Sequence, residues 1–333
     1  MRVVLGLLIA LWATDAAHAC GPALPSIERN AHARVWVADG VLTGCHRMRA
    51  EPVRLGRRAN VREVRLAGRF AGVRTRDLLV IHDLRRGRIE RMRRTRGAVT
   101  RWILDRGGVA AWLARRDDGD VVVGSSIEGV RARAADIDPH TLGLAGTEIA
   151  YRRGDTYEIT PLHDDDDRDA AATVLLRVGP VRIEVLTRRW TPFLYARIGA
   201  RRRWLGEPTG GCWSHNGCGG TNALQVAGRY VATRYNQHNP DYASGSITVR
   251  AVGGGPARRY CDERGDVGAF VLTRRGTAAC ALQLPGRPPS TSEVRVADEV
   301  VARGTGIDIH SLHRRGDELV WLDDDVEQTA PLP

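Results

Sequence analysis

A short β-strand pattern recurs along most of the chain, at intervals of 38 to 46 residues. Each copy has an alternating strand, a turn with glycine or arginine, and a second strand of Val-Ala-Trp character. The first strands centre on residues 66, 104, 144, 185, 226, 272 and 314, and a degraded copy lies upstream at Val35-Trp-Val-Ala-Asp-Gly. A unit of this size cannot bury both faces alone, so neighbouring copies must pack against one another.

The strand pattern predicts an all-β chain, because no long stretch keeps a helical period. A longer duplication lies on top of the repeat. Ala67-Gly-Arg-Phe matches Ala227-Gly-Arg-Tyr 160 residues later, and Ile137-Asp-x-His-Thr-Leu matches Ile307-Asp-x-His-Ser-Leu 170 residues later. We therefore expect a single domain over 20–333, built from two similar halves at about 30–165 and 175–333.

The period and strand pattern resemble exported bacterial β-propellers of the TolB-like and WD-repeat-like superfamily, over most of residues 30–333. The resemblance implies twisted four-stranded blades packed around an axis. Eight copies suggest eight blades of about 40 residues, whereas a tally of about 28 strands suggests seven, and both counts stand. The Gly-His and Trp-Asp dipeptides of WD repeats are absent. A long two-sheet sandwich or a β-solenoid is the structural alternative.

Residues 1–19 have the pattern of a cleaved signal peptide. Arg2 gives a positive start, Val3–Ala13 are apolar, and Ala17-His18-Ala19 form an A-x-A cleavage site. The alternative is a buried N-terminal helix or strand. The mature chain would begin at Cys20, and Ala17 and His18 fit a lipid-anchor motif poorly. The prediction is an exported protein, secreted or extracytoplasmic, with soluble export favoured over a lipid anchor at Cys20.

Six cysteines remain after that cleavage, and an even number in an exported chain predicts disulfides. They are Cys20, Cys45, Cys212, Cys218, Cys261 and Cys280. Proximity favours pairing Cys212 with Cys218 and Cys261 with Cys280, which leaves Cys20 for Cys45, although six cysteines allow fifteen pairings. A zinc site at Cys212, His215 and Cys218 lacks a C-x-x-C pair and a fourth ligand, so no metal site is predicted.

The net charge of +11 suggests a polyanion partner, but the chain has no lysine, so all fifty basic residues are arginine. Arginine, alanine and glycine have GC-rich codons, so part of this charge reflects codon composition. The run from Arg85 to Arg96 is interpreted as an edge strand protected by charge. Alternatively, this run and Arg201-Arg202-Arg203 bind phosphates or acidic sugars. No nucleic-acid partner is expected for an exported chain.

Two copies of an Asp-x-His-Thr/Ser motif suggest either a catalytic triad or a structural staple between strands. They are Asp138, His140 and Thr141, and Asp308, His310 and Ser311. Alternate residues of a strand share a face, so Asp308 and His310 would face together and Ser311 would point away. A triad requires histidine between acid and nucleophile. In WD-repeat propellers such residues tie the strands of one blade together, and the resemblance implies the same staple here.

Two loops remain as candidate ligand sites. The acidic turn Asp164, Asp165, Asp166 and Asp167 has carboxylates that suit Ca²⁺, but it lacks D-x-D-x-D-G spacing, so a solvated loop is preferred. The insertion from Gly210 to Gly220 carries Trp213, His215 and Asn216. An aromatic with two polar groups suits stacking on a sugar or peptide, and a disulfide-braced turn is the alternative.

No hydrolase, metalloprotease, phosphate-loop or dinucleotide motif is present, and the catalytic residues of any activity are unknown. We therefore expect an exported, non-catalytic propeller that binds a protein, peptide or glycan at the cell envelope. The alternative is a propeller enzyme, a glycan lyase or hydrolase, with its site at the central channel. No cofactor is predicted, a monomer is expected, and no apolar run reaches the roughly 18 residues of a membrane span.

Overall fold

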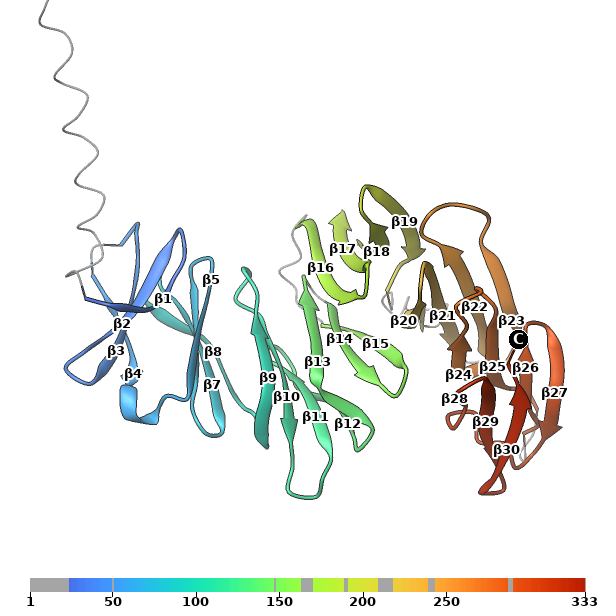
Figure 1. The fold of residues 1–333 in the computed structure, drawn as a ribbon. Coiled ribbons are helices and arrows are strands. Elements are labelled where there is room, and N and C mark those ends of the chain that lie inside the picture. Colours follow the sequence, from blue (N-terminus) through green and yellow to red (C-terminus); the bar gives the residue numbers. More distant parts are fainter. Residues whose placement is uncertain are drawn as a thin grey trace, which may run out of the picture. The chain divides into compact units, whose positions relative to one another are not determined.

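Strands make up nearly all of the regular structure (Figure 1). The computed structural model describes residues 24–49, 51–146, 148–162, 170–188, 191–208, 218–238, 243–286 and 290–332. Within these ranges, a 3-10 turn at Arg58–Asn60 is the sole helical element, and no helix is long and apolar enough to cross a membrane. The all-β prediction is therefore confirmed. The predicted signal peptide, residues 1–19, lies outside the described residues.

The first compact unit, Met1–Ala135, contains three four-stranded sheets in its described part. In each sheet the strands follow chain order and pair antiparallel, which is the arrangement of a propeller blade. The strands are β1 (Ser26–Arg29), β2 (Ala33–Ala38), β3 (Val41–His46), β4 (Val53–Arg57), β5 (Glu63–Ala67), β6 (Phe70–Arg74), β7 (Leu78–Asp83), β8 (Arg88–Arg94), β9 (Ala98–Leu104), β10 (Ala110–Arg115), β11 (Val121–Ser125) and β12 (Gly129–Ala134).

Two apolar layers hold these three sheets together. Val35 of the first sheet and Val64 of the second belong to one layer. Ile81 of the second sheet packs in the other layer with Trp102 and Trp112 of the third. Alternate strand residues point to opposite faces, so the middle sheet, β5–β8, contributes side chains to both layers. Packing between consecutive sheets is what the repeat pattern predicts.

The second compact unit, Asp136–Pro333, contains the remaining strands. They are β13 (Ile137–Ala145), β14 (Glu148–Arg153), β15 (Thr156–Pro161), β16 (Ala170–Val178), β17 (Val181–Arg188), β18 (Thr191–Ile198), β19 (Arg201–Gly206), β20 (Cys218–Ala227), β21 (Tyr230–His238), β22 (Ala243–Ala251), β23 (Arg258–Arg264), β24 (Asp266–Leu272), β25 (Ala278–Gln283), β26 (Ser292–Val296), β27 (Glu299–Gly304), β28 (His313–Arg315), β29 (Glu318–Asp323) and β30 (Val326–Pro331). Strands β16–β19 and β24–β27 are again four-stranded meanders, and β28–β30 form a three-stranded sheet.

One sheet of this unit is composite. Strands β15 and β20 pair at Tyr157–Leu224 and Glu158–Ala223, which joins β13–β15 to β20–β23 in a seven-stranded sheet. The sheet β16–β19 packs on one face of it, with Leu194 beside Leu224 and Val231 in the apolar layer. The sheet β24–β27 packs on its other face. The pairing of β15 with β20 departs from a simple succession of separate blades, and the repeat pattern does not predict it.

The duplicated sequence motifs occupy equivalent places in the structure. Gly68 in the turn between β5 and β6 and Gly228 in the turn between β20 and β21 have φ of +57° and +60°. Glycine adopts this left-handed conformation without steric cost, so both hairpins close tightly. Asp138 lies at the start of β13, and Asp308 lies shortly before β28. Each motif therefore occurs where a three-stranded meander begins.

One predicted copy of the repeat is wrong in its position within a blade. The segment from Ile183 to Thr187 was assigned to a first strand, but it lies in β17, the second strand of its sheet. The first strand is β16, which follows the acidic turn and shares no motif with the other copies.

The described strands form seven sheets, one of them composite, and the count of seven or eight blades stays a prediction. In the sequence, the first compact unit ends at Ala135 and the second begins at Asp136, whereas the sequence duplication predicts halves at about 30–165 and 175–333.

A disulfide joins Cys261 of β23 to Cys280 of β25, with the two Cα atoms 6.7 Å apart. It bridges two sheets that already share an apolar layer. Cys45 is also disulfide-bonded. Cys20 and Cys212 lie outside the described residues, and Cys218 is described only as the first residue of β20, so their pairing stays a prediction.

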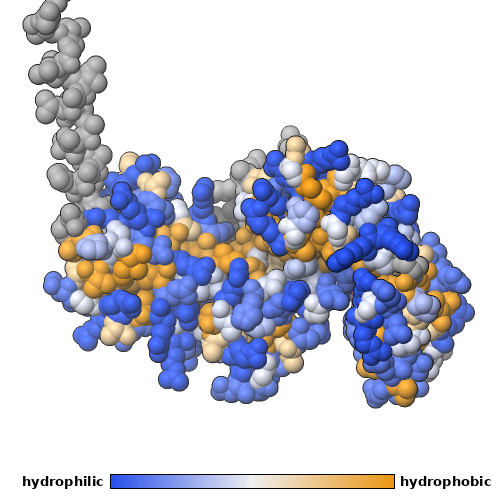
Figure 2. Space-filling view, in the orientation of Figure 1, coloured by the Kyte–Doolittle hydropathy of each residue, from blue (hydrophilic) through white to orange (hydrophobic). Residues whose placement is uncertain are grey.

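The arginine run from Arg85 to Arg96 includes an edge strand, since β8 (Arg88–Arg94) is the last strand of the sheet β5–β8. Ile89 and Met92 of this strand are exposed among its arginines. Charged side chains on an edge strand discourage pairing with a second chain. Figure 2 shows hydrophilic residues over most of the visible surface, with hydrophobic residues in small patches between them.

Candidate functional site

A pocket of about 550 Å³ lies between strand β19 and one face of strands β20–β23. Its size falls within the range of about 300–1,000 Å³ that small-molecule sites occupy. The described residues that line it are Trp204, Leu205, Gly206, Glu207, Gly219, Gly220, Thr221, Thr233, Tyr235, Gln237, Ser246, Thr248, Arg250 and Arg259. We call this the β19–β23 pocket.

Strand alternation explains why these side chains gather on one face. On β21, Thr233, Tyr235 and Gln237 are two residues apart and therefore point to the same side. On β22, Ser246 lies opposite Tyr235 and Thr248 lies opposite Thr233. The same face carries Val231 into the apolar layer with β16–β19, so the pocket begins where that layer ends. The alternate positions of β21 and β22 therefore form a polar face that continues from the apolar layer.

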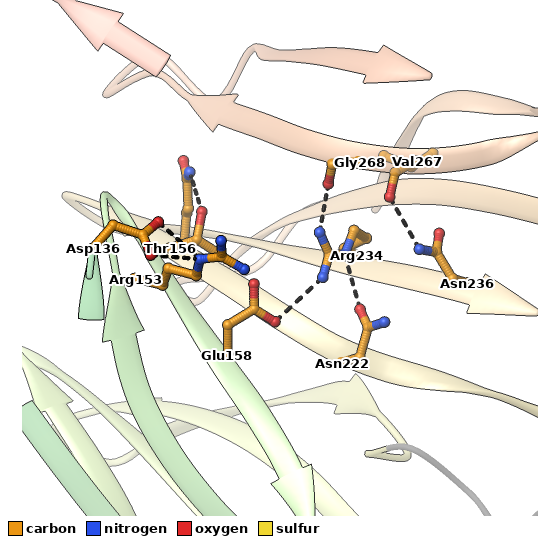
Figure 3. Close-up of polar contacts among 10 residues, drawn as sticks. Asp136, Arg153, Thr156, Glu158, Asn222, Arg234, Asn236, Val267 and Gly268 are labelled. Carbon is orange, nitrogen blue, oxygen red and sulfur yellow. Dashed lines mark hydrogen bonds and ion pairs between the residues drawn. The ribbon is translucent and has the colours of Figure 1, made fainter. Parts of the chain in front are cut away.

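The opposite face of the same strands anchors the sheet. Arg234 of β21 hydrogen-bonds the Asn222 side chain at 2.9 Å, pairs with Glu158 at 3.3 Å, and donates to the Gly268 carbonyl (Figure 3). Asn236 donates to the Val267 carbonyl at 3.0 Å. These contacts tie β21 to β15, β20 and β24. They fix the strand that presents the pocket side chains on its other face.

Two aromatic side chains form the exposed wall of the pocket. Trp204 on β19 is 49% exposed and Tyr235 on β21 is 39% exposed, whereas most other large apolar side chains in the described residues are buried. A Cβ at Gly219 would lie 2.7 Å from the Tyr235 hydroxyl, so the glycine makes room for this phenol. Exposed aromatic faces beside polar groups are suited to stacking on a ligand ring.

Hydroxyl groups line the floor of the pocket. Thr233 donates to the Thr248 carbonyl at 3.4 Å, so that hydroxyl is engaged in the sheet. The hydroxyls of Thr221, Tyr235 and Ser246 make no hydrogen bond to another described residue. Polar groups in a concave site of this kind are available to a hydroxyl-bearing ligand or to water.

Two arginines, Arg250 and Arg259, line this pocket, and the charge of Arg203 acts on Arg250 from nearby. Arg259 pairs with Asp262 at 3.0 Å, and Arg203 donates to the Gly255 carbonyl at 2.6 Å. Arg250 lies with its Cζ 5.6 Å from the centre of the Trp204 ring, and its buried Nη1 has no hydrogen-bond partner among the described residues. Burial, and then the charges of Arg203 and Arg259, lower the pKa of Arg250. An anion beside this guanidinium would favour its charged form and so oppose these effects on the pKa.

The loop predicted to bind ligand, Trp213, His215 and Asn216, lies outside the described residues. It connects β19 to β20 in the sequence. Gly206 and Gly219, in the two strands that flank the loop, both line the β19–β23 pocket. The sequence prediction therefore falls between two strands of the pocket, but it missed the residues on the strands themselves.

The first staple motif makes a local set of contacts at β13. Asp138 accepts hydrogen bonds from the His140 backbone at 2.9 Å and from the Thr141 hydroxyl at 2.8 Å. Arg152 of β14 pairs with Asp138 at 2.6 Å, and these contacts lower the carboxyl's pKa although burial raises it. His140 is exposed, and its ring makes no hydrogen bond to another described residue, although its charge also helps to lower the pKa of Asp138.

The second staple motif repeats part of this arrangement. The His310 backbone donates to the Asp308 side chain at 2.9 Å, and Ser311 donates to the Asp308 carbonyl at 2.7 Å. Ser311 also accepts a hydrogen bond from the Leu322 backbone, which links the motif to β29. The His310 ring is exposed. Neither motif places its histidine side chain between an acid and a hydroxyl.

The acidic turn Asp164–Asp167 lies outside the described residues, so the calcium alternative stays a prediction. Within the described ranges, no group of three or more His, Cys, Asp or Glu side chains is arranged to hold a metal ion.

Sequence reasoning missed Trp204, Tyr235 and Arg250, but a signal for the site was present. Strands of an antiparallel sheet commonly have one apolar face that is buried and one polar face. Both β21 and β22 carry polar residues at successive alternate positions, which place them on one face. On β22 the polar positions alternate with apolar ones and indicate an open face, whereas on β21 the opposite face is also polar, with Arg234 and Asn236, although it is bonded to β24.

The comparisons with known proteins identify resemblance in fold only. No protein-family model and no curated protein matches the chain. Solved structures that resemble it include Kluyveromyces marxianus Hsv2, which is 11% identical. The match covers 81% of this chain and 91% of that chain, with a TM-score of 0.28. A eukaryotic initiation factor has 9% identity, coverages of 85% and 89%, and a TM-score of 0.31. The β-propeller domain of Myceliophthora thermophila Cps50 (Swd1) has 13% identity, coverages of 78% and 95%, and a TM-score of 0.29. Since all three scores are below 0.5, the blade assignment depends on the chain's own four-stranded sheets.

Proposed function

We propose that this chain is a non-catalytic binding module and that the β19–β23 pocket binds a glycan. The observation that supports this most directly is the combination of an exposed tryptophan wall with a floor of unengaged hydroxyls. Sugars present apolar C–H faces that stack on aromatic rings and hydroxyls that exchange hydrogen bonds with polar side chains. A protein or peptide partner would use the same wall but would not require this hydroxyl-rich floor.

Removing the aromatic wall is expected to weaken glycan binding. Trp204→Ala should raise the Kd about tenfold or more, because a central aromatic contact at a binding site is commonly worth about 2 kcal/mol. The measurement is titration calorimetry of the full mature chain against a panel of neutral and acidic disaccharides. Trp204→Phe should retain most of the affinity, since it keeps an aromatic face.

Ile89→Ala is the matched control for Trp204→Ala, because Ile89 is a similarly exposed apolar residue, on β8 of the other unit. Its affinity should equal that of the unmodified protein. The proposal would be contradicted if no disaccharide in the panel binds, or if Trp204→Ala binds as tightly as the parent. Cleavage of a bound glycan would contradict the non-catalytic assignment.

We further propose that the protein acts outside the cytoplasm, at the cell envelope. The leader-like pattern of residues 1–19 supports this, as does the disulfide Cys261–Cys280, since disulfides persist in oxidising compartments. The intact mass of the protein recovered from the producing cells should correspond to a chain that starts at Cys20, without lipid and with no free thiol. A diacylglyceryl adduct, an uncleaved leader or several free thiols would each refute part of this expectation.

A further inference from the structure

The positive charge of the β19–β23 pocket is concentrated on one unpaired guanidinium. Arg259 has Asp262 as an ionic partner, and Arg203 is engaged by a backbone carbonyl. Arg250 has neither, and its cation–π contact with Trp204 leaves the buried Nη1 without a hydrogen-bond acceptor among the described residues. Glu207, the sole carboxylate among the described lining residues, forms no ion pair with Arg250.

A buried donor without an acceptor is costly. Other buried side-chain atoms in the described residues also make no hydrogen bond, and Arg250 differs from them in that it lines the pocket beside Trp204. A guanidinium presents parallel N–H groups in a plane, and a carboxylate accepts two of them at once. The pocket therefore offers one planar anion position next to an aromatic face and a floor of hydroxyls. A neutral sugar would satisfy the hydroxyls but would leave Arg250 without a counter-charge.

The geometry points to a uronic acid as the bound sugar, with its carboxylate on Arg250 and its ring against Trp204. This inference rests on the proposed glycan-binding function and adds the chemical class of the glycan. The remaining hydroxyls of the sugar ring would face Thr221, Tyr235 and Ser246. The hydroxyls of these three side chains make no hydrogen bond to another described residue. The favourable ion pair forms inside a pocket partly screened from water, where it is stronger than at an open surface.

The test compares oligouronates with their methyl esters, which keep the hydroxyls and remove the charge. Titration calorimetry of the full mature chain should give about ten- to a hundredfold tighter binding for an oligouronate than for its ester, as expected for one charged hydrogen-bonded pair. The panel contains di- and trisaccharides of glucuronate, galacturonate and mannuronate. Arg250→Gln should abolish the preference, so that this variant binds the acid and its ester with equal affinity.

Two further variants make the result specific to Arg250. Arg250→Lys should restore only part of the preference, because an ammonium cannot form the paired planar contact. Arg258→Gln should retain the full preference, since Arg258 is an exposed neighbour on β23 that does not line the pocket.

The outcomes separate this inference from the proposed function. Equal affinity for acid and ester, or a preference that survives in Arg250→Gln, would overturn the uronate assignment while leaving glycan binding intact. Tighter binding of sulfated or phosphorylated sugars than of every uronate would also overturn it. Failure of every saccharide, neutral or charged, to bind would overturn both.

Discussion

Replacing Trp112 by alanine is expected to destabilise the first unit by about 3–5 kcal/mol, the usual cost of deleting a large buried aromatic side chain. Trp112 on β10 has 0% exposure and packs in the layer between the sheets β5–β8 and β9–β12. Its ring N–H also donates to the Thr95 carbonyl at 3.3 Å. The alanine variant loses apolar contacts and leaves a cavity between two sheets. Urea unfolding followed by far-ultraviolet circular dichroism measures the change.

Trp204→Ala provides the size-matched control for Trp112→Ala, since Trp204 is 49% exposed. Its stability change should be at most about 1 kcal/mol. A comparable loss of stability in both variants would contradict the assignment of Trp112 to a tightly packed layer, because the two substitutions remove the same side chain.

A second substitution tests the packing of Trp112 directly. A Cβ added at Gly124 of β11 would lie 2.3 Å from the Trp112 ring, so Gly124→Ala should cost about 1–3 kcal/mol in the parent protein. In the Trp112→Ala background the same methyl group enters vacated space and should cost much less. Additive effects of the two substitutions would show that the two residues do not share a contact.

The blade-level fold could be predicted because its determinants are local. Alternation along a strand and a glycine in each hairpin are visible in a single segment, as at Gly68 and Gly228. The pairing of β15 with β20 could not be predicted in this way. It depends on two residue pairs about 65 positions apart, including Glu158–Ala223, and neither strand carries a distinguishing pattern. Strand order among distant segments is a tertiary property.

The candidate site illustrates the same division. The polar alternation of Thr233 and Tyr235 was available in the sequence, but only the fold shows that Trp204 of β19 stands over that face. The sequence predicts a staple at each Asp-x-His motif, and the structure gives Asp138 an ion pair with the next strand while His140 is exposed. Sequence spacing grouped the aspartate, histidine and hydroxyl residues without showing which side chains make contacts, because the exposure of the imidazole depends on how the meander packs.

The other large effect is expected at Glu293, where Glu293→Gln should destabilise the second unit by about 3–5 kcal/mol. Glu293 on β26 has 0% exposure. Its carboxylate contacts Arg295 at 2.5 Å and also pairs with Arg303, which lies directly across on β27. The side chain of Arg295 is only 11% exposed. Removing the carboxylate charge takes the ion pair with Glu293 away from a guanidinium that is almost fully buried, which costs more than breaking a surface ion pair.

Acid unfolding provides a second signature of the Glu293 site. Burial raises the pKa of Glu293, but hydrogen bonds from Arg295 and Arg303 outweigh it and hold the pKa below its usual value of 4.5. A carboxyl whose folded pKa is lowered contributes stability above its unfolded pKa and loses it as the pH falls through the folded value. The parent protein should therefore lose stability below about pH 4.5 more steeply than Glu293→Gln, which has no carboxyl to protonate.

Asp136→Asn is the matched control, because Asp136 and Arg153 form an ion pair at 2.8 Å with both side chains about half exposed (Figure 3). That variant should change stability by at most about 1 kcal/mol, since water already screens the pair and two mobile side chains must be ordered to form it. An equally small effect for Glu293→Gln would mean that water or the other contacts of Arg295 compensate for the lost charge. The buried cluster would then contribute no more than a surface contact, and the β26–β27 hairpin would depend on its apolar layer alone.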